Sequence, residues 1–184
     1  MKLKPLLIFI FIPLCIFSGV LTKELTFSET DFVFSKLDGY DLIMYPGNPA
    51  TGEKGHPILP VVCRYFVIPP DAEIENVEII AEEKVELQGM FVPYPVQAVR
   101  PFSVDKTLDF VFPDPVIYSS STPYPAKIIM HIPSGCLAGF RIAGINVYPL
   151  QYFPDKKTLV LYKKLKFNIH FRQNIYPVAK LTQS

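Results

Sequence analysis

Nineteen prolines are scattered along the 184 residues, with nine glycines among them, and no long stretch carries the apolar periodicity of a helix. Proline lacks an amide hydrogen and clashes with the preceding turn of a helix, so this density disfavours long helices. Short strands joined by turns accommodate it. The sequence therefore predicts an all-β fold, an antiparallel β-sandwich-like single domain.

The clearest strand pattern lies near the C-terminal end. We expect one strand over residues 141–153, a turn at 154–157 and a returning strand over 158–171. On the returning strand one face carries Leu159, Leu161, Leu165, Phe167, Ile169 and Phe171, and the other carries Tyr162, Lys164, Lys166, Asn168 and His170. This alternation is typical of an antiparallel sheet with one buried face. Lys163 alone breaks it, which indicates an edge or a bulge at that position.

Further strands are expected in the first half of the chain. Residues 25–45 contain two or three short β candidates with a turn at Asp38-Gly39, and residues 46–49 read as a loop. Residues 61–68 are rich in β-branched and aromatic side chains and end at a proline pair, which predicts a strand. Residues 72–88 also fit a helical stripe. A strand is predicted because five positions alternate on one face, namely Val77, Ile79, Ala81, Val85 and Leu87.

Residues 89–127 form a proline-rich and aromatic excursion between these parts. Short β candidates lie at 108–112 and 116–118. Long loops inside a compact domain are usually functional or disordered. The aromatic content argues against disorder, so we expect this excursion to serve a function.

The first 22 residues have the features of a secretory signal peptide. Lys2 and Lys4 precede an apolar run over residues 6–21, which is shorter than the about 20 apolar residues of a membrane-spanning helix. We place the mature start between Gly19 and Lys23, with an uncleaved signal anchor as the alternative. The expected division is a signal peptide over 1–22, one β domain over 23–176, and a tail or the start of a linker over 177–184. Such a protein is secreted or on the cell surface, with no membrane attachment after cleavage.

Charge and cysteine content narrow the function classes. Without Lys2 and Lys4 the 18 basic side chains become 16, against 17 acidic ones. A near-neutral chain does not follow a phosphate backbone, so nucleic acid is excluded as a partner. Cys63 and Cys136 are the cysteines of the mature chain. In an oxidising compartment they either form a disulfide or stay as two buried free thiols, and the sequence leaves both alternatives open.

Little in the sequence suits catalysis. The three histidines, His56, His131 and His170, are not at ligand spacing from one another, and no metal or cofactor motif occurs. His131 and Cys136 supply the residue types of a cysteine hydrolase within six positions, which is one hypothesis. Such pairs are assembled from different elements of a fold, however, and residues 133–135 read as a turn. The chain is therefore expected to be no enzyme, with no cofactor and no metal.

Several motifs occur in an order that resembles a known family. They are Gly55-His56-Pro57-Ile58-Leu59-Pro60, Ile68-Pro69-Pro70-Asp71-Ala72, Val116-Ile117-Tyr118-Ser119-Ser120, Tyr124-Pro125, Gly139-Phe140-Arg141-Ile142, Val147-Tyr148-Pro149-Leu150-Gln151-Tyr152-Phe153-Pro154 and Leu159-Val160-Leu161-Tyr162. Together they resemble the propeptide domain of gingipain-type (family C25) cysteine peptidases, over residues 27–171.

The resemblance implies a non-catalytic β-sandwich-like prodomain that packs on a caspase-like peptidase domain, covers its active-site cleft and assists its folding. In that family the catalytic histidine and cysteine lie in a downstream domain. This chain ends at Ser184, before such a domain, so a fused, a separately encoded and a lost peptidase all stay open.

A prodomain that inhibits must place something in the substrate cleft. Family members that cut after basic residues can be blocked by a basic side chain, and Arg100 in the excursion is the first candidate, with Lys106 second. Pro101 suits an occupant that resists cleavage, because it restrains the backbone and lacks an amide hydrogen. The alternative is an exposed arginine without a partner. For the whole chain, the alternative function is a stand-alone secreted β-sandwich for adhesion or ligand binding, supported by the excess of Tyr and Phe.

Overall fold

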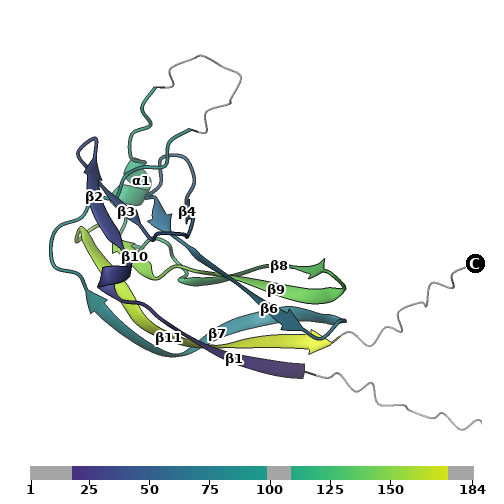
Figure 1. The fold of residues 1–184 in the computed structure, drawn as a ribbon. Coiled ribbons are helices and arrows are strands. Elements are labelled where there is room, and N and C mark those ends of the chain that lie inside the picture. The colour runs from purple at the N-terminus through teal and green to yellow at the C-terminus, as the bar shows by residue number, and fades with distance from the viewer. Residues whose placement is uncertain (1–17, 99–108, 174–184) are drawn as a thin grey trace, which may run out of the picture.

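The computed structural model describes residues 18–98 and 109–173 of the chain (Figure 1). Its elements are, in order, β1 (Ser18–Thr26), the 3-10 turn η1 (Glu29–Asp31), β2 (Val33–Leu37), β3 (Tyr40–Met44), β4 (Ala50–Thr51), β5 (Leu59–Pro60), β6 (Val62–Ile68), β7 (Ala72–Glu86), α1 (Pro115–Tyr118), β8 (Ile129–Leu137), β9 (Phe140–Val147), β10 (Leu150–Phe153) and β11 (Thr158–Gln173). Strands dominate and each helix is a single turn, which confirms the predicted all-β fold.

The larger sheet has four strands, and β11 is the partner of all the others. Along one edge of β11, β10 pairs with its first residues and β1 with its later ones, from Thr26 opposite Lys164 to Ser18 opposite Arg172. Along the other edge runs β7, over nearly the whole length of β11. All three pairings are antiparallel. The expected mature start between Gly19 and Lys23 therefore falls within β1.

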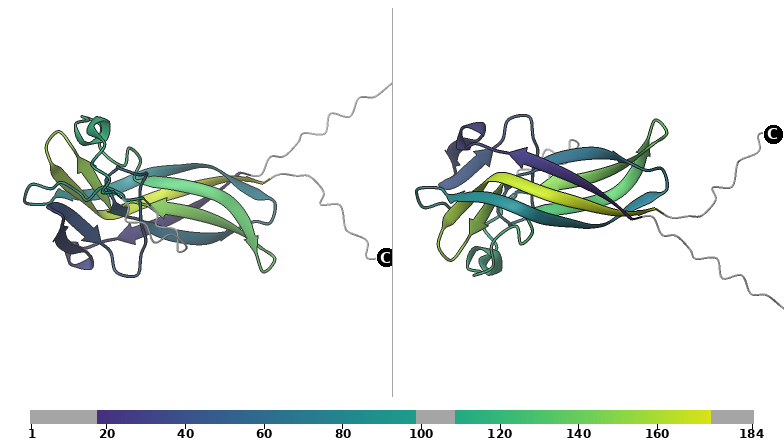
Figure 2. Two further views of the ribbon diagram at one scale, coloured as in Figure 1. Left: turned by 90° about the horizontal axis from the view of Figure 1, so that it is seen from above. Right: turned by 90° about the horizontal axis from the view of Figure 1, so that it is seen from below.

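The smaller sheet has three antiparallel strands in the order β6–β9–β8. It lies over the larger sheet, and the two form a twisted sandwich (Figures 1 and 2). We call this two-sheet part the arm. The layered arrangement confirms the expected antiparallel sandwich.

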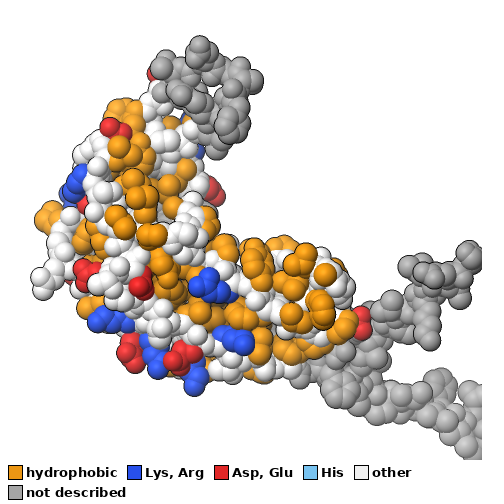
Figure 3. Space-filling view, viewed as in Figure 1, with side chains coloured by type: hydrophobic (Ala, Val, Ile, Leu, Met, Phe, Trp, Pro, Cys, Tyr) orange, Lys and Arg blue, Asp and Glu red, His pale blue; other side chains and the backbone are white. Residues whose placement is uncertain are grey.

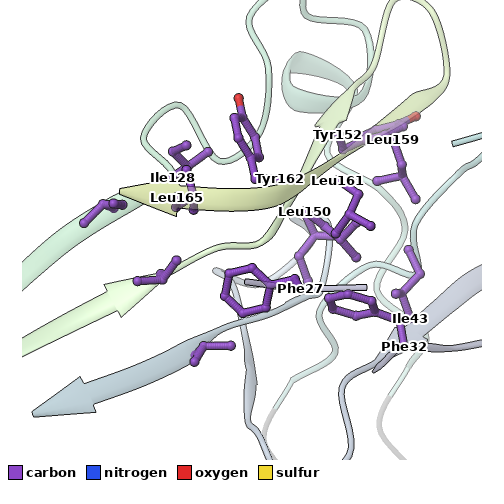
Figure 4. Close-up of a cluster of buried hydrophobic side chains, with 14 of the residues drawn as sticks. Phe27, Phe32, Ile43, Ile128, Leu150, Tyr152, Leu159, Leu161, Tyr162 and Leu165 are labelled. Carbon is purple, nitrogen blue, oxygen red and sulfur yellow. The ribbon is translucent and has the colours of Figure 1, made fainter. Parts of the chain in front are cut away.

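The core fills the space between the two sheets and continues under the neighbouring loops. Leu159, Leu161, Leu165, Phe167 and Ile169 of β11 have no exposed surface. Figure 4 shows part of this core, in which Leu150, Leu161 and Leu165 lie close to Phe27. Burying a large aliphatic or aromatic side chain contributes about 1.5–3 kcal/mol. The alternating apolar face of β11 is therefore a main source of stability, as its pattern predicted.

At one end of the arm stands a smaller unit, the head, set at an angle to the sheets (Figure 1). It contains the hairpin β2–β3, the short pair β4–β5, α1 and the residues of the excursion that flank α1. The hairpin turns at Asp38 and Gly39, both with positive φ (50° and 85°), as a two-residue hairpin loop requires. The predicted turn at these residues is confirmed.

Several other sequence predictions also hold. Residues 62–68 form β6, the loop at 46–49 joins β3 to β4, and residues 72–86 form β7 rather than a helix. At Lys163 the register of β11 against β7 shifts between Tyr162 and Lys164, which is the predicted bulge. The carbonyl of Lys163 accepts a hydrogen bond from the Phe27 amide at 2.8 Å, so the irregularity also anchors the end of β1.

The single strand predicted over 141–153 is wrong, because the chain changes sheets within it. β9 belongs to the smaller sheet and β10 to the larger one. Between them the Tyr148 amide donates to the Ile128 carbonyl and the Pro149 carbonyl accepts from the Tyr162 amide, so Tyr148 and Pro149 carry the chain across. The predicted turn at 154–157 and the long returning strand are confirmed.

The predicted faces of β7 are partly wrong. Leu87 is buried, but Ile79 and Val85 are exposed. β7 is an edge strand whose register against β11 shifts three times. Buried and exposed side chains therefore do not alternate regularly along it.

The predicted turn at 133–135 is also wrong, since β8 runs through these residues. An edge strand tolerates Pro133 and Gly135 at a bulge, and the register of β8 against β9 shifts between Ile132 and Gly135. The actual turn is at Ala138 and Gly139, both with positive φ.

The strand predicted at 116–118 is instead the helical turn α1. Pro115 occupies its first turn, and the Asp114 side chain accepts a hydrogen bond from the Val116 amide as an N-cap. Residues 109–112 are not a strand either.

None of the helices in the described part of the chain has the length and apolar character needed to cross a membrane.

Candidate functional site

Residues 55–58, which we call the platform, hold both ends of the proline-rich excursion. On its incoming limb (residues 91–98), the Gly55 amide donates to the Val96 carbonyl at 2.9 Å, and the Val96 amide donates to the His56 carbonyl at 2.8 Å. On its outgoing limb (residues 109–114), the Asp114 amide donates to the Gly55 carbonyl at 2.9 Å. The platform is the start of a motif that carried the family resemblance, and it positions the excursion.

Gly55 is the residue that both limbs share. Its φ is +83°, a left-handed conformation that side chains rarely adopt, and a Cβ there would lie 3.4 Å from the Phe112 carbonyl oxygen. Next to it, the His56 Nε2 atom lies 4.0 Å from the Asp114 Oδ2 atom, and the imidazole meets the Tyr124 ring edge to face at 5.8 Å. A backbone without a Cβ therefore allows the two limbs to approach the platform closely.

The side chain of Gln97 joins the two limbs directly. Its Nε2 donates to the Val111 carbonyl at 3.1 Å, and its Oε1 accepts from the Val111 amide at 2.9 Å. Nε2 also donates to the Pro95 carbonyl at 2.9 Å on its own limb. The amide side chain thus pairs with the Val111 peptide group as the backbone of a neighbouring strand would. It joins the two limbs at the base of the segment 98–110.

Aromatic rings pack around the same base. Phe110 on the outgoing limb stacks on Tyr40 of β3 and meets Tyr94 of the incoming limb edge to face, with 6.0 Å between centroids in each pair. Phe112 meets Phe110 at 5.2 Å. These contacts fix the limbs to the β2–β3 hairpin.

Two further hydrogen bonds secure the incoming limb from outside. The buried Asp41 side chain accepts from the Val92 amide at 2.8 Å and pairs with Lys36 at 2.7 Å. The Tyr118 hydroxyl of α1 donates to the Pro93 carbonyl at 2.7 Å. Burial raises the pKa of Tyr118 far above its usual range, so the phenol keeps its proton and remains a donor.

The sequence-predicted inhibitory residues, Arg100, Pro101 and Lys106, lie outside the described residues. Their flanking limbs are described, and both belong to the anchored base. Gln97 and Asp41 were not anticipated from the sequence. Gln97 is the one amide side chain in a limb of prolines and apolar residues. This pattern indicates a structural role only once the limb is known to be half-buried.

Cys63 and Cys136 are free thiols in the structure. They flank β9 from opposite sides and lie opposite Asn146 and Arg141, five positions apart along that strand. Cys63 is half-buried and its thiol donates to the Asn146 Oδ1 atom at 3.2 Å. Cys136 is exposed, so the structure departs from the alternative in which both cysteines are buried free thiols.

His131 and Cys136 both belong to β8. The Cys136 Sγ atom lies 4.0 Å from an Arg141 guanidinium nitrogen, and the described structure records no contact between the thiol and the His131 ring. Within residues 18–98 and 109–173, no three His, Cys, Asp or Glu side chains gather as metal ligands would.

The comparison with protein families identifies the chain. The model of the family Propeptide_C25 matches residues 25–183. The chain belongs to this propeptide family. None of the curated proteins compared with the C25 propeptide matches it.

Solved structures share the fold of the C25 propeptide. One is a complex of the pro- and mature domains of RgpB from Porphyromonas gingivalis, with 18% identity, a TM-score of 0.69, and coverage of 85% of this chain and 80% of that chain. Another is a structure on the zymogenic latency of gingipain K from the same organism, with 20% identity, a TM-score of 0.70, and coverage of 84% and 88%. These likenesses confirm the fold expected from the resemblance.

Proposed function

We propose that this C25 propeptide is the inhibitor and folding assistant of a secreted cysteine endopeptidase of caspase-like fold, either fused to it or encoded separately. The observation that carries the proposal is the anchoring of the excursion. Both ends of the segment 98–110 are fixed by the platform, by Gln97 and by the aromatic rings. A segment held at both ends enters a cleft with less loss of conformational freedom than a free one.

Within this segment, Arg100 is the residue proposed to occupy the substrate pocket, and Lys106 is the second candidate. Pro101, directly after Arg100, would restrain the backbone and remove an amide hydrogen. A basic side chain fits a peptidase that cuts after basic residues.

The chain itself is proposed to be non-catalytic, because the family is a propeptide family and the His131–Cys136 pair is not assembled in the structure. Secretion to the outside of the cell is proposed from the signal-like residues 1–22. The stand-alone adhesion module remains the competing function.

The inhibitory role is tested with the mature domain of the C25 peptidase encoded with this chain. Arg100→Ala is expected to weaken inhibition by about 30-fold or more, since truncating one partner of a buried charge pair costs about 2–5 kcal/mol. Arg172→Ala, at an exposed arginine of β11 that pairs with Glu75, is the matched control and should leave inhibition unchanged.

Unchanged inhibition by Arg100→Ala would remove Arg100 from the mechanism and turn attention to Lys106. A wild-type chain that neither inhibits the peptidase nor raises its refolding yield would refute the proposed function. The same result, together with no peptidase gene beside this one, would favour the adhesion module.

A further inference from the structure

The two outer faces of the sandwich differ in chemistry. On the larger sheet, polar contacts cross between strands on the solvent side. Ion pairs join Lys164 to Glu24 and Arg172 to Glu75, and the His170 Nε2 atom lies 3.2 Å from a Glu78 carboxylate oxygen. Such a face is stable in water without a partner.

The outer face of the smaller sheet carries no charge. The strand registers place on it the uncharged residues Cys63, Tyr65, Val67, Met130, Ile132, Gly135, Leu137, Phe140, Ile142, Gly144 and Asn146. Four of them are large and more than half exposed: Tyr65 (64%), Val67 (61%), Leu137 (69%) and Phe140 (60%). Contiguous exposed apolar surface of this kind marks an interaction site rather than a solvated face.

This apolar face is hollowed at its centre. Tyr65, Ile132, Leu137 and Ile142 surround a hollow of about 340 Å³ that opens to solvent. Gly144 also lines it. The Ile132 side chain lies directly over this glycine, where a Cβ would be 2.3 Å away, so the absence of a side chain at Gly144 lets Ile132 pack against the sheet as one wall of the hollow. Its size suits one or two apolar side chains.

The position of the face points to one occupant. Figure 1 shows the head rising on the side of the arm where the smaller sheet lies, so that the two enclose a corner. Figure 3 shows hydrophobic side chains along the arm up to this corner, with Lys or Arg side chains among them on the visible edge of the sandwich. The limbs of the excursion belong to the head. A peptidase domain that contacts both the limbs of the excursion and the arm would lie in this corner and meet the apolar face.

We propose that the outer face of β6, β9 and β8 is the surface on which this propeptide docks its peptidase domain, with the hollow receiving an apolar side chain of that domain. This inference rests on the proposed function and names a second contact besides the excursion. The docking face would bind the peptidase by burying apolar surface, whereas the excursion would inhibit it by occupying the substrate cleft.

The test measures the dissociation constant between the secreted chain and the mature domain of the C25 peptidase encoded with it, in which the catalytic cysteine is replaced by alanine. Val67→Glu places a carboxylate on the apolar face. Gly135→Leu fills the hollow, and nothing lies within 4 Å of its new Cβ, so the fold accommodates it. Thr26→Glu, an exposed strand position of the larger sheet, is the matched control.

Both face variants should weaken binding about tenfold or more. A few buried apolar residues supply most of the binding energy of such interfaces, and these substitutions prevent them from being buried. The control should stay within about twofold of wild type. Thermal unfolding of each variant verifies that it folds. Wild-type affinity in both face variants would overturn the docking face and leave the proposed function standing. Self-association of the wild type that Val67→Glu abolishes, with peptidase affinity unchanged, would assign the face to a second copy instead. A wild-type chain that does not bind the peptidase overturns both proposals.

Discussion

Replacing Gln97 by methionine tests whether the anchored base of the excursion matters for inhibition. Methionine keeps the length and the flexibility of the side chain but has no amide. The substitution removes both hydrogen bonds to Val111 and the one to the Pro95 carbonyl. The platform contacts of Val96 and Asp114 stay in place.

The expected magnitude follows from two terms. Only the two hydrogen bonds to Val111 join the limbs, and each contributes about 0.5–1 kcal/mol net, so the loss of closure is about 1–2 kcal/mol. The closed loop also grows, from residues 98–110 (13 residues) to 97–113 (17 residues). Its additional closure entropy is only about 0.2 kcal/mol, because the cost depends on the logarithm of loop length. The hydrogen bonds therefore decide the outcome.

The assay is the inhibition constant of this chain against the mature domain of the proposed C25 peptidase partner. A loss of about 1–2 kcal/mol corresponds to inhibition weakened about 5–30-fold. Gln88→Met, at an exposed glutamine outside the base, is the control and should inhibit like the wild type. An unchanged inhibition constant for Gln97→Met, or an equal loss in the control, would refute the reasoning that the anchored base prepares the segment for its cleft.

Four further predictions concern stability, measured by urea unfolding. Asp41→Ala should lower the free energy of unfolding by about 1–3 kcal/mol, because the Val92 amide loses its acceptor; a loss within error would contradict this. Gly55→Ala should cost about 1–2 kcal/mol, since alanine is strained at a φ of +83°; a more stable variant would rule out that strain. Ile145→Val, at a fully buried position, should cost about 1 kcal/mol, and no cost would mean that the site repacks. Burial raises the pKa of Tyr152 to about 12 from 10.0. The folded state therefore favours the neutral phenol, and its contribution is complete below pH 10 and lost as pH rises through about 12. Tyr152→Phe should flatten this alkaline decline, and an identical pH profile would exclude Tyr152 as its source.

The arm was predictable where one strand face is buried throughout. The alternation of β11 identified Leu159, Leu161, Leu165, Phe167 and Ile169, which all lie in one core cluster, and the break at Lys163 identified the bulge. It did not identify Tyr162, which was expected on the polar face and is buried as well. The break between β9 and β10 was not predictable, since residues 141–153 remain apolar across it and sequence alone does not show which sheet a strand joins. The turn predicted from Pro133 and Gly135 was wrong for a related reason. An edge strand accepts them, but edge position is a property of the whole sheet.

The candidate site likewise has a part that could be predicted from the sequence and a part that could not. The excursion and the Gly55 motif were recognisable because their composition is local. The contacts of Gln97 and Asp41 depend on partners 14 and 51 positions away, so no local pattern reveals them. The role of Arg100 stays a prediction.

The central strand of the larger sheet is also its last in sequence. β1, β7 and β10 all hydrogen-bond to β11, so this sheet cannot form until residues 158–173 have been made. Contacts between residues as distant as Ser18 and Arg172 place the chain among slow-folding topologies. Under the proposed export, the chain would have time to cross a membrane unfolded, because β11 is synthesised after the three strands that it joins.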